Sequence, residues 1–343
     1  SSTISLTNQG LITLKAVDTA APSNSSHISS GAAVNVANYG TIDLAISSGD
    51  FLREAGASSL EDLTLAQVET ALKNMYVIDS GSTGTFSSVG YIKFSDGKYF
   101  TTAAALDGSH SIEDLSAALA QQSEAEKAFS VSDSKTLTLT AENSTDKLSN
   151  VQLNLAGTLA TDGTNDITID NSTSDRIINI TESGKVNVTD AKTLNYSGNI
   201  TVANGASSTS AAIVVDGTGT LKLSNGEMNM QAPETTTYTT SADRVGIELE
   251  GNGTLDFDNY TVNADIKGEV NSNRLQGTLN AKGNSKINGT VTDIKDIEIT
   301  DEGMLTFGAD SVIVSTAMDE TTINIANGNM GVEIGENGKN VLL

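Results

Sequence analysis

Ser80 is the residue whose neighbours best suit a catalytic nucleophile. It stands in the run Asp79-Ser80-Gly81-Ser82, and His27 precedes it in the chain. Asp43 and Asp50 lie between the two. A serine, a histidine that takes its proton and an aspartate that orients the histidine together cleave acyl bonds. The chain therefore holds the residue types of a hydrolytic triad in the order His, Asp, Ser.

The Asp-Ser-Gly run resembles the nucleophile segment of chymotrypsin-like proteases, but its spacing does not fit them. Those enzymes take their His and Ser from two separate β-barrels, which together need roughly 200 residues. Here His27 and Ser80 are 53 residues apart, with a predicted helix between them. We interpret Ser80 as part of a Ser-Gly loop after a strand and expect no catalytic residue.

Grouped carboxylates offer a second chemistry, because two Asp or Glu side chains can cleave a glycosidic bond. Two groups have suitable spacing, namely Asp256, Asp258 and Asp265 in one stretch and Asp162, Asp166 and Asp170 in another. Glycan-cleaving proteins of pectinase or tailspike type usually add basic or aromatic residues along the same groove. Outside residues 47–130 the aromatic residues are scattered singly, at Tyr39, Tyr196, Tyr238, Phe257, Tyr260 and Phe307. We therefore interpret the Asp groups as solvated acidic faces.

Metal binding has little support in this sequence. Asp162-Gly-Thr-Asn-Asp166 has the oxygen-rich character of a calcium loop, but it lacks the glycine and terminal Glu of an EF-hand. The Gly-Gly-x-Gly-x-Asp calcium repeat is absent too. The chain has no Cys, which excludes disulfides and thiolate metal sites. We expect neither a metal nor a cofactor.

The elements that would position these residues follow a repeat. In each copy a glycine at a corner precedes apolar residues two apart, as expected for a short strand with one apolar side. The copies are Gly10-Leu-Ile-Thr-Leu14, Gly40-Thr-Ile-Asp-Leu44, Gly184-Lys-Val-Asn-Val188, Gly219-Thr-Leu-Lys-Leu223, Gly253-Thr-Leu-Asp-Phe257 and Gly303-Met-Leu-Thr-Phe307. With fainter copies at Gly157, Gly277 and Gly331, the steps are 24 to 35 residues. This period predicts an all-β, right-handed parallel β-helix, a solenoid of stacked coils.

Composition agrees with this fold. The chain has 343 residues with 31 Gly, two Pro, no Trp, and abundant Ser, Thr and Asn. Asn and Gly suit tight left-handed corners, and stacked Asn side chains can form hydrogen bonds along a solenoid axis. The net charge of −24 argues against binding to nucleic acid and against docking on anionic lipid. It fits a protein that stays soluble outside a cell.

The repeat stops between about Ser47 and Ser130, where helical periodicity appears. Helices are predicted to begin at Ser59-Leu-Glu-Asp-Leu63 and Ser111-Ile-Glu-Asp-Leu115, each with a capping Ser and acids in the first turn. Between them we predict a strand near Tyr76-Val-Ile78 and a hairpin that turns at Asp96-Gly97. Eight of the fourteen Phe and Tyr residues lie in this segment.

We therefore predict three parts. Residues 1–46 form N-terminal coils, residues 47–130 form a small inserted α+β subdomain with its own core, and residues 131–343 form further coils. Residues 231–244, which contain Pro233, are predicted to be a long corner loop within the last part. Because each coil leans only on its neighbours, the insertion is expected to be replaceable by a short linker.

The phrases Asn8-Gln-Gly-Leu-Ile12 and Asn38-Tyr-Gly-Thr-Ile42, with the Gly-Thr-Leu repeats, resemble passenger domains of Gram-negative autotransporters (type V secretion). The resemblance covers nearly all of the chain except about 47–130. It implies a right-handed β-helix at the cell surface of a Gram-negative bacterium, or secreted, and many such passengers are adhesins. No family active-site residue matches. Since the chain opens in mid-pattern, we expect it to be a mature or truncated piece of a longer protein.

We expect a non-catalytic adhesin passenger whose inserted segment recognises a host-cell or bacterial surface receptor, protein or glycan. Exposed hairpin tips and clustered aromatic residues are typical of binding surfaces. The residues expected to bind are Tyr91, Lys93, Asp96, Lys98 and Tyr99. Two alternatives are open. One is self-association along the coil walls, and the other is a glycan-cleaving or glycan-binding β-helix such as a phage tailspike.

Overall fold

The computed structural model describes residues 3–8, 11–14, 33–38, 41–60, 63–76, 86–88, 91–101, 106–120, 127–203, 210–231, 244–308 and 311–332. The chain forms two compact units. The N-terminal unit comprises Ser1–His110 and Asp114–Ser130, and the C-terminal unit comprises Ser111–Glu113 and Val131–Leu343. Three elements contain residues of both units, namely β8 (Gly108–Ser111), α3 (Ile112–Leu119) and β9 (Ala128–Val131).

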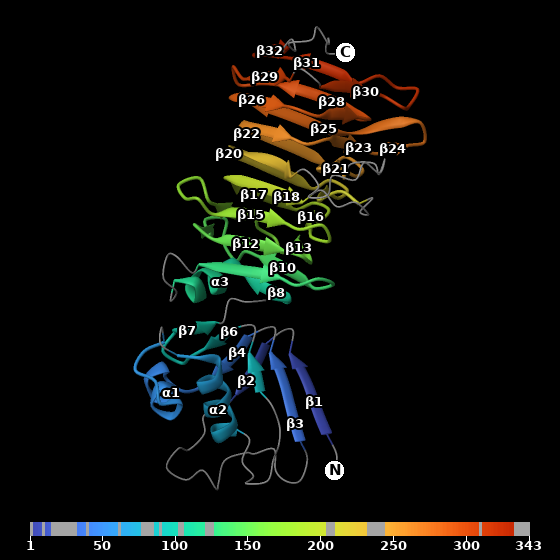
Figure 1. Cartoon of the computed structure of the whole chain (residues 1–343). Coiled ribbons are helices and arrows are strands. Elements are labelled where there is room, and N and C mark those ends of the chain that lie inside the picture. Colours follow the sequence, from blue (N-terminus) through green and yellow to red (C-terminus); the bar gives the residue numbers. More distant parts are fainter. Residues whose placement is uncertain are drawn as a thin grey trace. The chain divides into compact units, whose positions relative to one another are not determined.

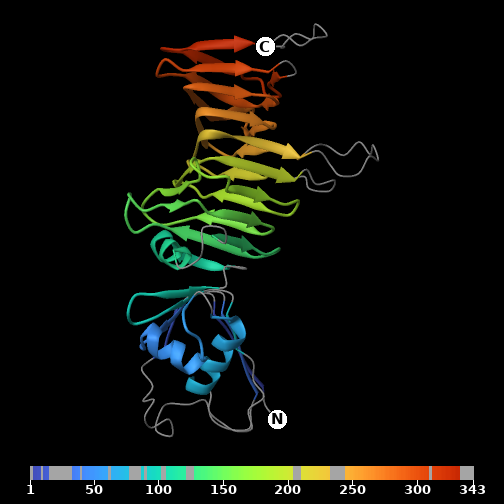
Figure 2. The ribbon, with the colours of Figure 1, turned by 60° about the vertical axis from the view of Figure 1, so that its left-hand side comes forward.

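The C-terminal unit is a stack of parallel strands in three walls, and successive turns of the chain add strands to each wall (Figures 1 and 2). Wall A contains β10 (Thr136–Thr140), β13 (Thr158–Thr161), β16 (Lys185–Val188), β19 (Ile213–Val215), β21 (Ile247–Leu249), β23 (Ile266–Gly268), β27 (Thr290–Thr292) and β30 (Val312–Val314).

Walls B and C share two long bent strands, β20 (Thr220–Gln231) and β22 (Thr254–Asn263). Wall B contains β11 (Leu148–Ser149), β14 (Ile167–Asp170), β17 (Thr193–Ser197), the first halves of β20 and β22, β25 (Arg274–Lys282), β28 (Ile294–Ile299) and β31 (Thr322–Ile325). Wall C contains β12 (Gln152–Leu155), β15 (Ile177–Ile180), β18 (Asn199–Ala203), the second halves of β20 and β22, β26 (Asn284–Ile287), β29 (Met304–Phe307) and β32 (Asn329–Val332). A short strand, β24 (Val270–Asn271), pairs antiparallel with the start of β25.

Alternation along each strand separates the core from the surface. In wall B the parallel register stacks one inward side chain from each turn upon the next, and these side chains are at most 1% exposed. This column consists of Ile167, Leu194, Leu221, Leu255, Leu279 and Ile297. Among the residues that the structure describes, strands make up about half and helices about a tenth. The predicted all-β parallel solenoid is therefore confirmed.

The repeat glycines serve a different purpose from the one expected. Gly184, Gly219 and Gly253 lie outside the positive-φ region, and each donates its N–H to the carbonyl three residues earlier. A Cβ at Gly184 would collide with the carbonyl oxygen of Leu155 in the preceding turn. The glycines are thus required by close contact between turns. Left-handed corners occur at Asn225 (φ 50°) and Asn259 (φ 51°) and at other glycines such as Gly217 (φ 55°) and Gly251 (φ 57°), as predicted for Asn and Gly.

The N-terminal unit contains two small sheets. One orders β1 (Thr3–Asn8), β3 (Ala33–Asn38) and β5 (Phe86–Ser88), all parallel. The other orders β2 (Leu11–Leu14), β4 (Thr41–Leu44), β6 (Tyr91–Lys93) and β7 (Tyr99–Thr101). In this sheet β7 is antiparallel to β6, so the predicted hairpin is present.

The expected boundary at residue 47 does not appear in the structure. Strand β6 pairs with β4 and β5 with β3, so β5 and β6 add a further layer to the two sheets. The core is shared as well, because Ile42 and Leu44 of β4 pack in one cluster with Phe51, Leu72 and Ile92. The helices therefore interrupt a continuous stack and do not form a separate subdomain with its own core.

The helices also differ from the expectation. Helix α1 (Ser48–Ala55), capped by Ser47, was not predicted. Helix α2 (Leu65–Tyr76) begins after Thr64, whose hydroxyl accepts from the Gln67 N–H at 3.3 Å, and not after Ser59. Tyr76 is the last residue of α2 and so does not begin the predicted strand, whose other residues, 77 and 78, lie outside the described residues. Helix α3 follows Ser111 as predicted.

Candidate functional site

Four neighbouring strands of wall B, β17, β20, β22 and β25, carry outward polar side chains in three parallel rows. Alternate residues of a strand point to opposite faces of the sheet. These rows therefore lie on the solvent face, opposite the buried column that runs from Ile167 to Ile297. Row 1 consists of Thr193, Thr220, Thr254 and Thr278, row 2 of Asn195, Lys222, Asp256 and Asn280, and row 3 of Ser197, Ser224, Asp258 and Lys282.

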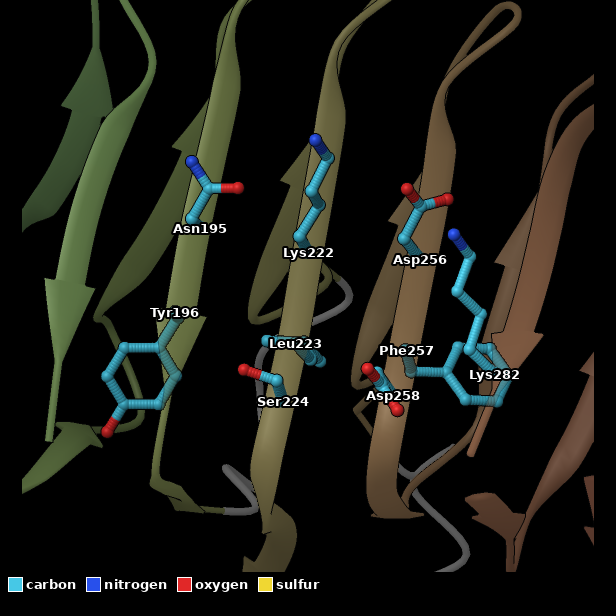
Figure 3. Close-up of a pocket in the computed structure, with 9 residues that line it drawn as sticks. All are labelled: Asn195, Tyr196, Lys222, Leu223, Ser224, Asp256, Phe257, Asp258 and Lys282. Carbon is cyan, nitrogen blue, oxygen red and sulfur yellow. The ribbon is translucent and has the colours of Figure 1, made fainter. Parts of the chain in front are cut away.

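The surface above these strands is hollowed into a groove of about 280 Å³. Figure 3 shows the side chains that line it. Its floor is formed by Tyr196, Leu223 and Phe257, whose side chains belong to the core and are 1% exposed. The rim is formed by side chains of rows 2 and 3. The volume is at the small end for ligand pockets, which suits one sugar ring or one protruding side chain.

Charges alternate across the groove. Asp256 Oδ1 accepts a hydrogen bond from Asn280 Nδ2 at 2.6 Å, so the in-register neighbours hold each other in place. Lys282 Nζ forms an ion pair with Asp301 Oδ2 at 2.9 Å. Asp301, through this hydrogen bond and its charge, raises the pKa of Lys282, and the charges of Asp256 and Asp258 add to the rise. Figure 3 agrees, because the Lys282 ammonium is directed toward Asp256.

Lys222 differs from Lys282. Its side chain is exposed, and its ammonium makes no hydrogen bond or ion pair within the part of the chain that the structure describes. The groove therefore offers one unengaged ammonium beside two carboxylates. A polar partner in the groove could accept a hydrogen bond from the ammonium and donate hydrogen bonds to the carboxylates.

The structure brings Asp256 and Asp258 together but not Asp265, whose Oδ1 accepts from the Thr290 N–H at 2.7 Å beyond the wall C corner. In the other predicted group, Asp162 and Asp166 are exposed. Asp170 accepts from the Ser172 hydroxyl at 2.7 Å and pairs with Lys147 at 3.1 Å, and these contacts lower its pKa against the effect of burial. This group therefore acts in local turns and surface ion pairs.

The predicted hairpin site has a different geometry from the one expected. Tyr99 is 5% exposed, and its hydroxyl donates to Asp114 Oδ1 at 2.7 Å. Lys93 Nζ lies 3.9 Å from the same oxygen and 5.6 Å from the centre of the Tyr99 ring. The backbone of Tyr91 pairs with Thr41 and Thr101. Tyr99 is therefore part of the packing of the N-terminal unit and is not an exposed aromatic contact.

At the hairpin tip, Asp96 is occupied by a helix. Its Oδ2 accepts from the Ser48 N–H at 3.2 Å and from the Ser48 hydroxyl at 2.6 Å, at the start of α1. Partial burial would raise the pKa of Asp96, but these hydrogen bonds and that from the Lys98 N–H lower it on balance. Lys98 is exposed. The tip thus holds α1 in place, with Lys98 as its outward charge.

His27 and Asp79-Ser80-Gly81-Ser82 lie outside the described residues. Asp50 accepts from the Ser47 hydroxyl at 2.9 Å and pairs with Arg53 at 2.9 Å within α1. Asp43 is half-buried in β4. Asp50 is therefore engaged in capping and pairing at the start of a helix.

Sequence reasoning missed Arg244, a buried guanidinium that ties three turns together. It donates to the carbonyls of Thr181 at 2.9 Å and Ser210 at 3.2 Å, and also to Gly184 and Ala203. Burial lowers the pKa of Arg244, and the charge of Glu182 opposes this shift. Residues 232–243 of the predicted loop lie outside the described residues. Arg244 is the last residue of that loop, and nothing in the sequence around it indicated that its side chain would join several turns.

Wall C carries the Asn ladder that the composition suggested. Asn263 Nδ2 donates to Asn229 Oδ1 at 2.6 Å, and Asn288 Nδ2 donates to Asn263 Oδ1 at 2.7 Å. Each bond joins side chains of adjacent turns. These amides therefore stiffen the wall along the stack.

No helix among the described residues is long and apolar enough to cross a membrane. The same residues contain no group of three or more His, Asp or Glu side chains arranged to hold a metal ion. Comparison of the chain with protein-family models, with curated proteins and with solved structures finds no match.

Proposed function

We propose that this chain is a non-catalytic adhesive β-helix, of the kind presented or secreted by Gram-negative autotransporters, and that it attaches cells through the outer walls of its C-terminal unit. One observation carries the proposal. The outward side chains of wall B form in-register rows of hydroxyl, amide and charged groups over four strands, with a groove between them. Such a wall offers many weak hydrogen bonds, which add up along its length.

The wall is a better contact surface than the hairpin tip. Asp96 is engaged by Ser48, and Tyr99 is buried against Asp114, so two of the residues expected to bind are used inside the unit. Binding hot spots require side chains that are exposed before the partner arrives. On wall B, Lys222 and Asp258 are exposed.

Glycan binding is a second candidate, because the groove has room for one sugar ring. Asp256 and Asp258 could accept from sugar hydroxyls, and Lys222 could donate to them. Cleavage is less well supported. The two carboxylates lie two residues apart on one strand, roughly 7 Å from each other along it, and Asp258 is exposed. A general acid is normally held in an apolar pocket that keeps it protonated.

Adhesion can be tested by displaying the chain on a bacterium that does not adhere by itself. We expect attachment to cultured host cells or aggregation of the bacteria, measured by microscopy and by settling. Thr220→Arg with Thr254→Arg places bulky charges on wall B and should reduce attachment at least tenfold, with an unchanged circular dichroism spectrum. Lys98→Ala, on the hairpin tip, is the matched control and should have little effect.

Two results would overturn the proposal. One is the absence of attachment to every cell type when surface display is normal. The other is the release of small sugars from a glycan by the purified chain, which would indicate an enzyme. If only the Lys98→Ala variant lost attachment, the contact surface would be the hairpin tip and not wall B.

A further inference from the structure

Row 2 of wall B becomes its own charge complement when its order is reversed. Across β17, β20, β22 and β25 its members are an amide (Asn195), an ammonium (Lys222), a carboxylate (Asp256) and an amide (Asn280). Reversing the order exchanges positive for negative at the centre and amide for amide at the ends. Row 1 has a Thr in all four places, so it is unchanged by the reversal.

This order makes the face complementary to itself. Consider a second copy of the chain turned by a two-fold axis that runs parallel to the strands, between β20 and β22. The operation reverses the order of the strands and keeps each position along a strand, so each row meets its own copy. Lys222 then lies opposite Asp256 of the second copy, and Asp256 opposite Lys222 of the second copy. Asn195 lies opposite Asn280, and in row 3 Ser224 lies opposite Asp258.

The groups required for this pairing are accessible. Lys222 is exposed and makes no ion pair in the part of the chain described here. Figure 3 shows its ammonium apart from the Asp256 carboxylate, although the two residues are in register on adjacent strands. Asp256 uses Oδ1 to accept from Asn280, which leaves Oδ2 free to accept from a second copy.

The distribution of charge also favours this face over the rest of the surface for contact between two copies. The chain carries −24, so two copies repel each other over most of their surface. In rows 1 to 3 the two Lys, at 222 and 282, balance the two Asp, at 256 and 258. The complementarity ends at the next strands, because Asp166, just before β14, would lie opposite Asp296 of β28. The contact is therefore limited to the four strands.

We propose that two copies of this chain pair antiparallel through rows 1 to 3, about a two-fold axis between β20 and β22, with two symmetric Lys222–Asp256 ion pairs at the centre. The inference deepens the proposed adhesive function, on which its biological meaning rests, by naming a second copy as the partner. Four strands at about 4.8 Å spacing and five residues of length give only about 300 Å² per copy, so we expect weak pairing. On two cell surfaces many such contacts would act together.

Charge reversal gives a sharp test, measured by sedimentation equilibrium of the purified chain over micromolar to millimolar concentrations. Lys222→Asp places two carboxylates opposite each other at both central contacts, and Asp256→Lys places two ammoniums there. Each variant alone should pair at least tenfold more weakly than the wild type. An equimolar mixture of the two variants should recover the pairing, because every central contact then joins opposite charges.

The mixture separates pairing from folding, since a variant that failed to fold could not be rescued by another. Lys267→Asp is the matched control, because it changes the net charge by the same amount on wall A. It should leave the association unchanged. Unchanged pairing in both single variants, no recovery in the mixture, or a wild type that stays monomeric throughout would overturn the inference.

The outcome also distinguishes this inference from the proposed function. If the wild type attaches cells but remains monomeric in solution, the proposed adhesive function stands and the antiparallel pair is wrong. If the wild type pairs in solution but its displayed form attaches no cells, the antiparallel pair stands and the proposed adhesive function is wrong.

Discussion

Two tyrosines inside the C-terminal unit differ in the hydrogen bonding of their hydroxyls. The Tyr196 hydroxyl donates to the Asn199 carbonyl at 2.7 Å. The Tyr260 hydroxyl is fully buried and has no hydrogen-bond partner within the described part of the chain. A buried polar group without a partner costs free energy, whereas a bonded one contributes about 1 kcal/mol.

The matched substitutions Tyr260→Phe and Tyr196→Phe should therefore change stability in opposite directions. We expect Tyr260→Phe to raise the free energy of unfolding by about 1 kcal/mol, because it removes only the unpaired hydroxyl. We expect Tyr196→Phe to lower it by about the same amount. Urea unfolding followed by circular dichroism measures both. A destabilised Tyr260→Phe variant would mean that the hydroxyl has a partner in solution.

Burial also predicts a loss of stability at high pH. Burial raises the pKa of Tyr196 to about 12, against a hydrogen bond with Asn171, and raises that of Tyr260 well above its usual value. In the unfolded chain a Tyr loses its proton near pH 10. The unfolded state thus binds fewer protons than the folded state between about pH 10 and 12, so stability is complete below this range and falls as pH rises through it.

Urea midpoints at about pH 9 and about pH 11.5 measure this effect. The decrease between them should be smaller in Tyr196→Phe than in the wild type, because the variant has one buried phenol fewer to ionise. An equal decrease in both would show that Tyr196 is not the cause.

At the scale of the element, the repeat glycines are the strongest constraint on the stack. Gly184 has no room for a Cβ against Leu155 of the preceding turn, whereas Gly49 in α1 has nothing closer than the Ser47 hydroxyl at 3.9 Å. Gly184→Ala should lower the free energy of unfolding by about 2–4 kcal/mol, since a backbone turn must shift. Gly49→Ala is the control and should be neutral or stabilising by up to about 1 kcal/mol. Thermal unfolding compares the two, and equal stability would contradict the close contact.

Arg244 is a second residue at which a substitution should weaken the contact between turns. Arg244→Met keeps an unbranched apolar stem but leaves the carbonyls of Thr181, Gly184 and Ser210 without this donor. We expect a loss of about 2–4 kcal/mol, measured by urea unfolding. Arg274→Met, on the exposed β24–β25 hairpin, is the control and should have almost no effect. A similar small effect of both substitutions would show that the turns do not depend on Arg244.

For the whole molecule, the charge of −24 acts against the compact state. Salt shortens the range of this repulsion to about 10 Å at 0.1 M. The thermal midpoint near pH 7 should therefore rise by a few degrees between about 0.01 M and 0.3 M NaCl. Near pH 4.2, where the net charge is close to zero, the rise should disappear. A midpoint that falls with salt near pH 7 would mean that ion pairs outweigh the repulsion.

The sequence by itself determined the stacked parallel strands and their inward residues. Apolar residues two apart place one side of each strand in the core, and a glycine before the strand permits the next turn to approach. Both are local properties, so the leucines of wall B could be assigned inward from the sequence. The hairpin at Asp96-Gly97 and the start of α3 after Ser111 are also encoded by a few adjacent residues.

Only the tertiary structure decided which side chains outside the repeats meet between turns. The aligned repeats Gly219–Leu223 and Gly253–Phe257 already place Lys222 beside Asp256, whereas Arg244 reaches Thr181, 63 residues earlier, only because of how the turns pack. The burial of Tyr99 against Asp114 and the stacking of β6 on β4 depend on helices that fold back onto the sheet. Such contacts join residues far apart in the chain, and no local pattern specifies them.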